Sequence, residues 1–160
     1  MPLILVEASP LISFLKLDRF DLLEILEQPL ACTDFVRAEI QRPREKLNEI
    51  LTSGDLKEVP LENPHHFLEV EKMYDKGLGR GEASSIVLAE ANGYGLIMDD
   101  KRAQKVAMAR KVTLFTTADV VVRNIQSNKI TLAEADEFIV QWKDLGEFPI
   151  SVKTFADLIR

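Results

Sequence analysis

Apolar residues along the chain fall into short continuous runs and into stretches with helical spacing, and the two kinds alternate. The first run, Leu3–Val6, is apolar throughout, as expected for a strand buried on both faces of a sheet. Directly after it, Ser9 and Pro10 provide an N-cap and a first-turn proline, which predict the start of a helix. Further apolar runs predict strands at residues 30–33, 56–59, 96–98 and 112–115.

Helices are predicted between these strands. Asp34 is a good N-cap for a helix that runs to about Arg42, and Thr131 and Glu134 have the spacing of a capping box. The other helical patterns cover residues 11–26 with a break near residue 18, a segment from residue 63, and residues 82–92, 101–110, 118–126 and 131–145, with a last short helix after residue 151.

This alternation predicts the fold class. Strands that alternate with helices through short connections are typical of an α/β fold, in which a mainly parallel central sheet carries helices on both faces. No internal repeat and no linker interrupts the pattern. Residues 1–160 are therefore predicted to form one domain, with the helices of about 131–160 packing on it.

The composition narrows the possible functions. Hydrophobic residues make up 46% and charged residues 29% of the chain, which is typical of a globular protein rather than a disordered one. The net charge of −6 argues against a protein that coats nucleic acid through bulk electrostatics. An enzyme that holds metal ions in an acidic pocket remains compatible with that charge.

Targeting signals and cysteine chemistry contribute little. No apolar run approaches the length of roughly 20 residues that a membrane span needs, and the apolar N-terminus lacks a basic leader. We therefore expect a cytoplasmic protein. The single cysteine, Cys32, cannot form an intrachain disulfide and is interpreted as a small buried group.

Acidic residues from distant parts of the chain are predicted to meet at one edge of the sheet. Glu7 follows the first strand, and Asp99 and Asp100 follow the strand 96–98, so all three belong to the carboxyl edge where α/β proteins bind ligands. Glu82 opens a helix after a glycine-rich loop, where the helix dipole tolerates a carboxylate. Glu39 lies within the helix that begins near Asp34, beside apolar neighbours.

Such a group of carboxylates suits a hard cation. Mg²⁺ and Mn²⁺ prefer oxygen ligands, and a bound ion can activate water and neutralise the charge that develops on a phosphodiester. No GxxxxGK[ST], GxSxG or HExxH motif offers a competing chemistry. The alternative is that these acids are only helix caps or solvated charges.

Four short segments, taken together and in order, resemble PIN domains, and most of all the VapC-related branch of prokaryotic toxin–antitoxin systems. These segments are residues 6–12 (VEASPLI), 36–39 (VRAE), 79–83 (GRGEA) and 99–103 (DDKRA). The resemblance implies an α/β/α sandwich and a Mg²⁺- or Mn²⁺-dependent ribonuclease. It further implies a toxin that acts on RNA, a small antitoxin partner and a homodimer.

Site residues carry over from the resemblance by position. They are Glu7, Glu39, Glu82 and Asp100 as catalytic acids, with Glu7, Glu82, Asp100 and the alternative Asp99 as metal ligands. The first acid of the family pattern is usually Asp, and the extra methylene of Glu7 shifts the carboxylate and adds a rotatable bond. This departure supports an alternative function, a non-catalytic PIN-like module that binds RNA or protein. A further polar position is often seen in PIN domains, and Thr116, Thr117 and Asp119 are equal candidates for it.

Basic residues after Asp100 could steer RNA phosphates towards the acids, or could form an ordinary solvated helix face. They are Lys101, Arg102, Lys105, Arg110 and Lys111, and Arg80 in the glycine-rich loop is a separate candidate. The adjacent His65 and His66 are interpreted as surface residues. A stripe of apolar residues at helical spacing predicts core packing or, as the alternative, a dimer surface: Leu132, Ala135, Phe138, Ile139, Trp142 and Leu145.

Overall fold

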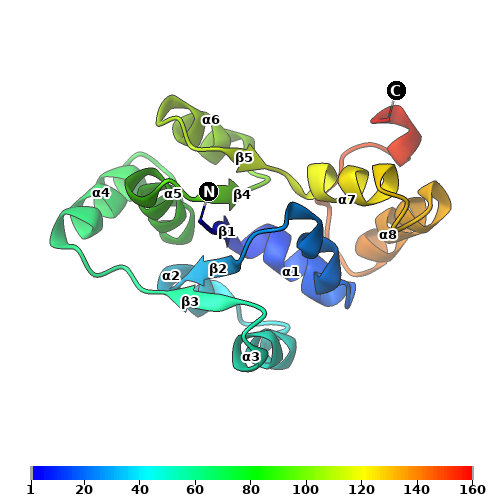
Figure 1. Ribbon diagram of the computed structural model, residues 1–160. Helices are drawn as coiled ribbons and strands as arrows, with labels where there is room; N and C mark the ends of the chain where they lie inside the picture. Colours follow the sequence, from blue (N-terminus) through cyan, green and yellow to red (C-terminus); the bar gives the residue numbers. More distant parts are fainter. Residues whose placement is uncertain (1, 160) are drawn as a thin grey trace.

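The computed structural model describes residues 2–159, in which five parallel strands form one sheet between two layers of helices (Figure 1). The strand order is β3-β2-β1-β4-β5, and every neighbouring pair is parallel. The strands are β1 (Ile4–Val6), β2 (Leu30–Thr33), β3 (Lys57–Val59), β4 (Gly95–Ile97) and β5 (Leu114–Phe115). The predicted α/β class with a parallel sheet is confirmed.

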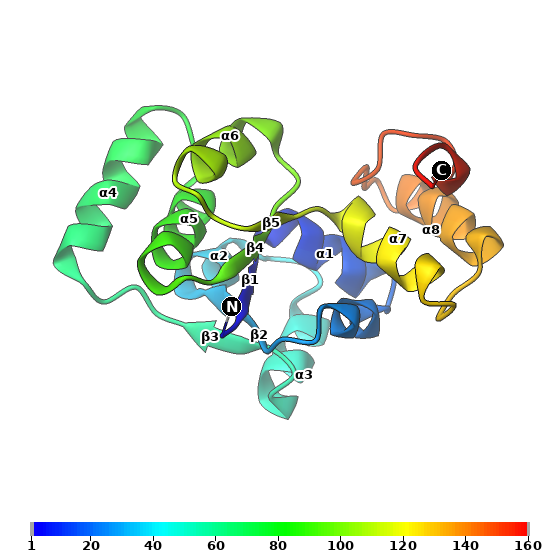
Figure 2. The same cartoon turned by 45° about the horizontal axis from the view of Figure 1, so that its top comes forward.

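Helices connect the strands and continue beyond the sheet. They are α1 (Ala8–Lys16), η1 (Phe20–Leu26), α2 (Asp34–Glu39), α3 (Arg44–Ser53), α4 (Pro64–Asp75), α5 (Arg80–Asn92), α6 (Lys101–Ala109), α7 (Thr117–Gln126), α8 (Leu132–Asp144) and η2 (Phe155–Asp157), where η marks a 3-10 helix. Figure 2 shows α4, α5 and α6 at one end of the molecule and α7, α8 and η2 at the other.

The alternating side chains of the short strands divide the core into two parts. Ile4 and Val6 of β1 pack into a cluster with α1, α7 and α8, whereas Leu5 packs into a second cluster with α4, α5 and α6. All three side chains have no solvent exposure. The sheet is therefore covered on both faces, which confirms the α/β/α sandwich.

The caps of two helices differ from the prediction. Glu7, not Ser9, is the N-cap of α1, because its carboxylate accepts a hydrogen bond from the Ser9 N–H. Thr33, not Asp34, caps α2 through its hydroxyl. The Asp34 carboxylate instead accepts from the N–H of Leu61, 27 residues away, a long-range partner that local sequence does not reveal.

One helix boundary also differs from the prediction, and one helix is additional to it. α2 ends at Glu39 instead of near Arg42, because the next residue, Ile40, leaves the helix in an extended conformation and is fully buried. α3 begins at Arg44 and lies outside the predicted helices. Leu47 is its one buried residue, so the apolar face of α3 is narrow and its helical pattern is weak.

The C-terminal helices belong to the same core as the strands. Trp142 of α8 packs edge-on against Phe14 of α1, with ring centroids 6.2 Å apart, and its Nε1–H donates to the Ser13 carbonyl at 2.8 Å. Ala135 and Phe138 of the predicted stripe are buried in this cluster, whereas Leu132 and Leu145 at its ends are exposed. Core packing is therefore the role of the middle of the stripe. Among the described residues, the helices are too short or too polar to cross a membrane.

Candidate active site

The strand order places the carboxyl ends of β1 and β4 side by side. The direction of the strand order reverses between them, because β2 and β3 lie on one side of β1 whereas β4 and β5 lie on the other. Residues Ile4 to Val6 of β1 pair in register with Gly95 to Ile97 of β4. In parallel α/β sheets this switch point is where ligands bind. β1 and β4 lie side by side in Figure 1. Glu7 follows β1 directly, and Asp99 and Asp100 follow β4 after one residue, so the structure brings these predicted acids to the same edge of the sheet.

Glu7 is the buried member of the group. Only 6% of the residue is exposed, and its carboxylate accepts from the Ser9 N–H at 3.1 Å at the N-terminus of α1. Burial raises the pKa of Glu7, and the nearby carboxylates of Glu39 and Asp99 raise it further, while the backbone hydrogen bonds act in the opposite direction. The helix N-terminus is what makes a charge tolerable at this depth.

Glu82 and Asp100 form a pair of carboxyl groups in direct contact. Their side chains lie within hydrogen-bonding reach of one another, and burial together with this contact raises the pKa of Glu82 to about 7. A neighbouring carboxylate disfavours ionisation of a carboxyl group, in agreement with the raised pKa of Glu82. Each also accepts from the backbone: Glu82 from the Gly79 N–H at 2.9 Å, and Asp100 from the Arg102 N–H at 3.1 Å.

Glu39 reaches the cluster from the last turn of α2 and rests on the first turn of α5. The Gly81 N–H donates to its carboxylate at 2.8 Å. A Cβ on Gly81 would lie 2.5 to 2.7 Å from the carboxylate atoms of Glu39, which is closer than non-bonded atoms approach. A side chain at position 81 would therefore displace the Glu39 carboxylate, and this close approach is a signal that the sequence prediction does not use.

The N-terminus of α7 holds the carboxylate of Asp99. Its carboxylate accepts from both the N–H (2.8 Å) and the hydroxyl (2.6 Å) of Thr117, so both of its oxygens are engaged. Burial is the main cause that raises the pKa of Asp99, and the two Thr117 bonds oppose it. Thr116 and Asp119 form the capping box of α7 instead. Of the three candidates for the further polar position, Thr117 is the one that touches a site acid.

The predicted RNA-binding cations have different environments. Arg80 pairs with Glu71 (Nε to Oε1, 2.9 Å) and lies 3.8 Å above the centroid of the Tyr74 ring. Arg102 donates to the carbonyl of Lys76 at 2.7 Å, so both arginines make contacts within the protein.

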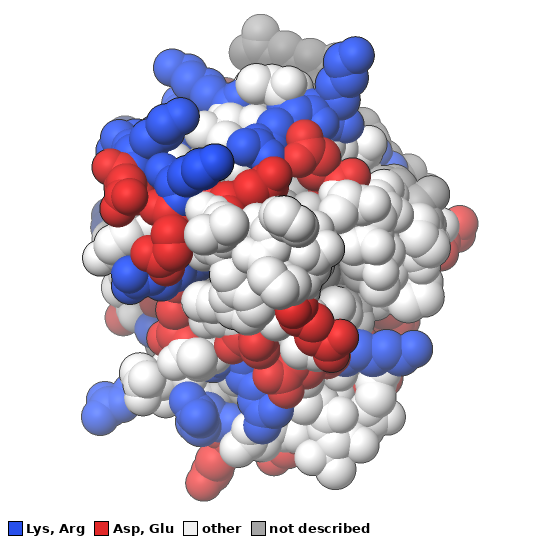
Figure 3. All heavy atoms as spheres, turned by 90° about the vertical axis from the view of Figure 1, so that its left-hand side faces the viewer, with Lys and Arg blue, Asp and Glu red and all other residues white. Residues whose placement is uncertain are grey.

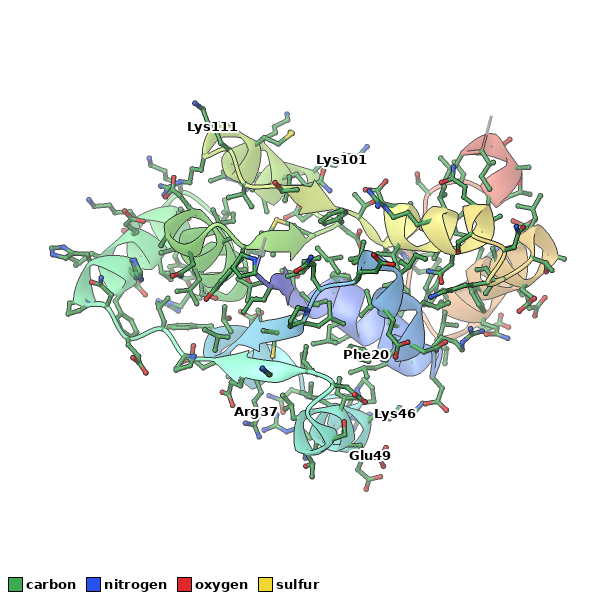
Figure 4. All side chains as sticks on the ribbon, in the orientation of Figure 1. Phe20, Arg37, Lys46, Glu49, Lys101 and Lys111 are labelled. Atoms are coloured by element: carbon green, nitrogen blue, oxygen red, sulfur yellow. The ribbon has the colours of Figure 1, made fainter. Side chains whose placement is uncertain are left out.

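The lysines of α6 are exposed. Lys101 and Lys105 lie on its surface, and Figure 4 labels Lys101 at the start of the helix and Lys111 just beyond its end. Figure 3 shows lysine and arginine side chains gathered over α6, at the top of that view. Arg110, the C-cap residue of α6, differs from these lysines because its guanidinium forms ion pairs with Glu69 and Glu90.

The remaining residues with candidate chemistry lie outside the cluster. His65 is exposed and His66 half-buried in the first turn of α4, as the surface interpretation predicted. Cys32 in β2 is fully buried, and burial raises its pKa to about 12, so the thiol is a poor nucleophile.

An α/β/α sandwich with a parallel sheet and an acidic switch point has the features of a PIN-like protein. The chain belongs to the PIN-domain family, because the sequence profile of the family DUF3368, a PIN domain, matches residues 3–160. No curated protein matches the chain. PIN domains are nucleases in general, so the family indicates hydrolysis of nucleic acid.

PIN domains generally use divalent metal ions, and the donor chemistry of this site fits such an ion. In Glu39, Glu82 and Asp100 one carboxylate oxygen accepts a backbone hydrogen bond, and no hydrogen bond within residues 2–159 reaches the other. In the same part of the chain, no three His, Cys, Asp or Glu side chains are arranged to hold a metal ion together. Mg²⁺ usually takes one or two carboxylates and keeps several waters, so the Glu82–Asp100 pair is sufficient for it.

Proposed function

We propose that the chain is a Mg²⁺- or Mn²⁺-dependent endoribonuclease of the VapC-like branch, and that it acts as the toxin of a toxin–antitoxin pair. The observation that carries the proposal is the contact between Glu82 and Asp100 at the switch point, flanked by Glu7 and Glu39. Two carboxyl groups in contact repel each other unless a proton or a cation lies between them.

The roles of the residues follow from their surroundings. Glu82 and Asp100 would hold the ion, with Glu7 as the buried carboxylate behind them and Glu39 fixed on Gly81. A bound ion lowers the pKa of a coordinated water and neutralises charge on a phosphodiester. Asp99 has both oxygens engaged by Thr117, so we assign it to positioning of the β4 end and not to the ion.

Cleavage of RNA tests this proposal directly. A single-stranded RNA is incubated with the protein in Mn²⁺ and in EDTA, and cleavage is expected in Mn²⁺ only. Asp100→Asn should abolish it, because the variant keeps the helix cap but loses the charge. Asp55→Asn is the matched control, since Asp55 is exposed and precedes β3 at the opposite edge of the sheet. RNA binding without cleavage in any divalent ion would instead support the non-catalytic module.

The toxin role and the partners need their own tests. We propose a small antitoxin protein as partner and a homodimer as the working form. Induction in a bacterial host should arrest growth for the wild type and not for Asp100→Asn. A small gene for a DNA-binding partner next to this one would support the pairing, and sedimentation of the purified chain would establish whether it dimerises.

A further inference from the structure

A small groove lies beside the acid cluster, between the start of α6 and the C-terminal segment. Its volume is about 240 Å³, and it runs from Asp99 along one wall formed by α6 and the β5–α7 connection. The other wall comes from the segment between α8 and the C-terminus. The lining residues used below are Asp99, Lys101, Gln104, Ile150, Val152 and Leu158.

We propose that this groove is a subsite for one nucleotide of a single-stranded RNA, next to the phosphodiester at the carboxylates. The inference rests on the proposed function and adds a substrate-binding element to it. Asp99 belongs to both places, since it lines the groove and directly precedes Asp100 of the cluster at the carboxyl end of β4. A strand that crosses the carboxylates therefore has its neighbouring nucleotide at the mouth of the groove.

The two walls suit the two parts of a nucleotide. Lys101 is exposed, and its ammonium group is available for a phosphate at the polar wall. In Figure 4 it stands at the end of α6 nearer the C-terminal segment, whereas Lys111 stands at the far end. Gln104 uses its Nε2 to donate to the Met98 carbonyl at 2.8 Å, which leaves its amide oxygen as an acceptor for a base.

The opposite wall is aliphatic. Ile150, Val152 and Leu158 line it, and Leu158 is 43% exposed although it is a large apolar residue. The aliphatic wall would contact the flat face of a base, while Lys101 would bind the phosphate and the Gln104 oxygen would accept from the edge of the base. The groove is smaller than the 300–1,000 Å³ of pockets for drug-sized ligands. It has room for one splayed base and not for a duplex, so single-stranded RNA is the matching class.

Binding of mononucleotides tests the subsite without any need for cleavage. Adenosine and uridine 5′-monophosphates are titrated into the ¹⁵N-labelled protein in EDTA, and backbone amide shifts are followed. Shifts should concentrate on Gln104, Thr116, Ser151 and Val152. Leu158→Asp should weaken the fitted Kd by about tenfold, because the base loses apolar contact and its phosphate meets a like charge.

Matched variants decide the outcome. Leu145→Asp places the same charge on a leucine that is 45% exposed and does not line the groove, so it should change the Kd by less than about twofold. Lys101→Ala should weaken binding, and Lys111→Ala should not. Equal effects of Leu158→Asp and Leu145→Asp, or shifts centred elsewhere, would overturn the subsite. If RNA is cleaved but mononucleotides cause no shifts in the groove, the subsite is wrong and the nuclease proposal is unaffected. If mononucleotides bind in the groove and no RNA is cleaved, the nuclease proposal is wrong and the subsite is unaffected.

Discussion

At the scale of single residues, the five candidate carboxylates share one type of support. Each accepts a hydrogen bond from a backbone N–H at the N-terminus of a helix: Glu7 at α1, Glu39 and Glu82 at α5, Asp100 at α6 and Asp99 at α7. The positive ends of four helix dipoles therefore point at the switch point. They offset part of the repulsion between the acids.

The raised pKa of Glu82 predicts a pH-dependent stability. In the unfolded chain the group titrates near 4.5, and in the folded chain near 7, so between these values the folded state binds more protons than the unfolded state. The free energy of unfolding should therefore fall as the pH rises through this window. Glu82→Gln should remove this fall and make the protein more stable above pH 7, by less than the full pKa shift implies, because solvent screens a half-exposed carboxyl group.

Chemical denaturation in EDTA at several pH values measures this effect. Gln at position 82 can still accept from the Gly79 N–H, so the start of α5 is preserved. Glu134→Gln is the matched control, because Glu134 has the same place in the first turn of α8 but is exposed and distant from the cluster. If the two variants have the same pH profile, the pKa of Glu82 is not raised in the folded protein.

At the scale of elements, a chain of hydroxyl groups fixes α2 against α5. The Thr33 hydroxyl accepts from the Val36 N–H and lies 2.7 Å from the Ser84 hydroxyl, which in turn donates to the Gly81 carbonyl at 2.7 Å. Thr33 and Ser84 are fully buried. This chain sets the register at which Glu39 meets Gly81, although the two residues are 42 positions apart.

Gly81→Ala should show whether the position of the Glu39 carboxylate affects RNA cleavage independently of the stability of the fold. A Cβ would lie 2.5 Å from Glu39 Oε2, so the carboxylate must move, while Ala is favoured over Gly in a helix by about 1 kcal/mol. We expect an unchanged or higher melting temperature together with a loss of RNA cleavage of about a hundredfold. Adding Glu39→Asp shortens the displaced side chain and should restore part of the activity. A variant that unfolds easily and is not rescued would show that Gly81 is only structural.

The lysines of α6 predict the salt dependence of RNA binding. Lys101 lies in the first turn of α6, where a cation opposes the helix dipole, so its removal should not lower stability. Replacing Lys101 and Lys105 by Ala should weaken RNA binding and reduce the slope of log K against log salt by about 1.4, if each contacts one phosphate. Fluorescence anisotropy in EDTA measures the slope, with Lys129→Ala in the α7–α8 connection and Lys143→Ala in α8 as exposed controls. An unchanged slope would make these lysines an ordinary solvated surface.

Local sequence predicted the elements and strand-end acids well, because both follow from patterns within a few residues. The run Leu3–Val6 gave a buried strand, and a parallel sheet then brings Glu7 and Asp100 to one edge. The sequence did not predict that Gly81 supports Glu39, that Thr117 engages both oxygens of Asp99, or that Arg80 pairs with Glu71. Those contacts join residues from separate elements, so they depend on tertiary packing that no local pattern encodes.

At the scale of the whole molecule, basic side chains gather on a surface beside the acid cluster. The chain carries a net charge of −6, yet lysines and arginines gather over α6 next to the acid cluster (Figure 3). The carboxylates that would hold an ion lie between the two helical layers, at the edge of the sheet. Binding of a cation there should therefore stabilise the entire fold, because the unfolded chain has no such site.

Melting temperatures with and without Mn²⁺ test this link between site and fold. Without metal, Asp100→Asn should melt at the same temperature as the wild type or higher, since it removes one charge from the cluster and keeps the cap of α6. With Mn²⁺ it should lose most of the stabilisation. Glu7→Asp is the contrasting variant and should keep the metal response, because Asp is the usual residue of the family at this position. An Asp100→Asn variant that melts several degrees lower without metal and keeps the full response would make Asp100 a structural cap.

The packing of α8 on α1 gives the protein an internal optical probe. Trp142 is the only tryptophan in the chain, and its indole is buried against Phe14 and hydrogen-bonded to Ser13. Both tyrosines, Tyr74 and Tyr94, lie on the opposite helical layer, at α4 and at the end of α5. Tryptophan fluorescence therefore follows the α1–α8 layer alone, and tyrosine signals follow the other layer. Coincidence of the two unfolding curves would show that both layers melt as one cooperative unit.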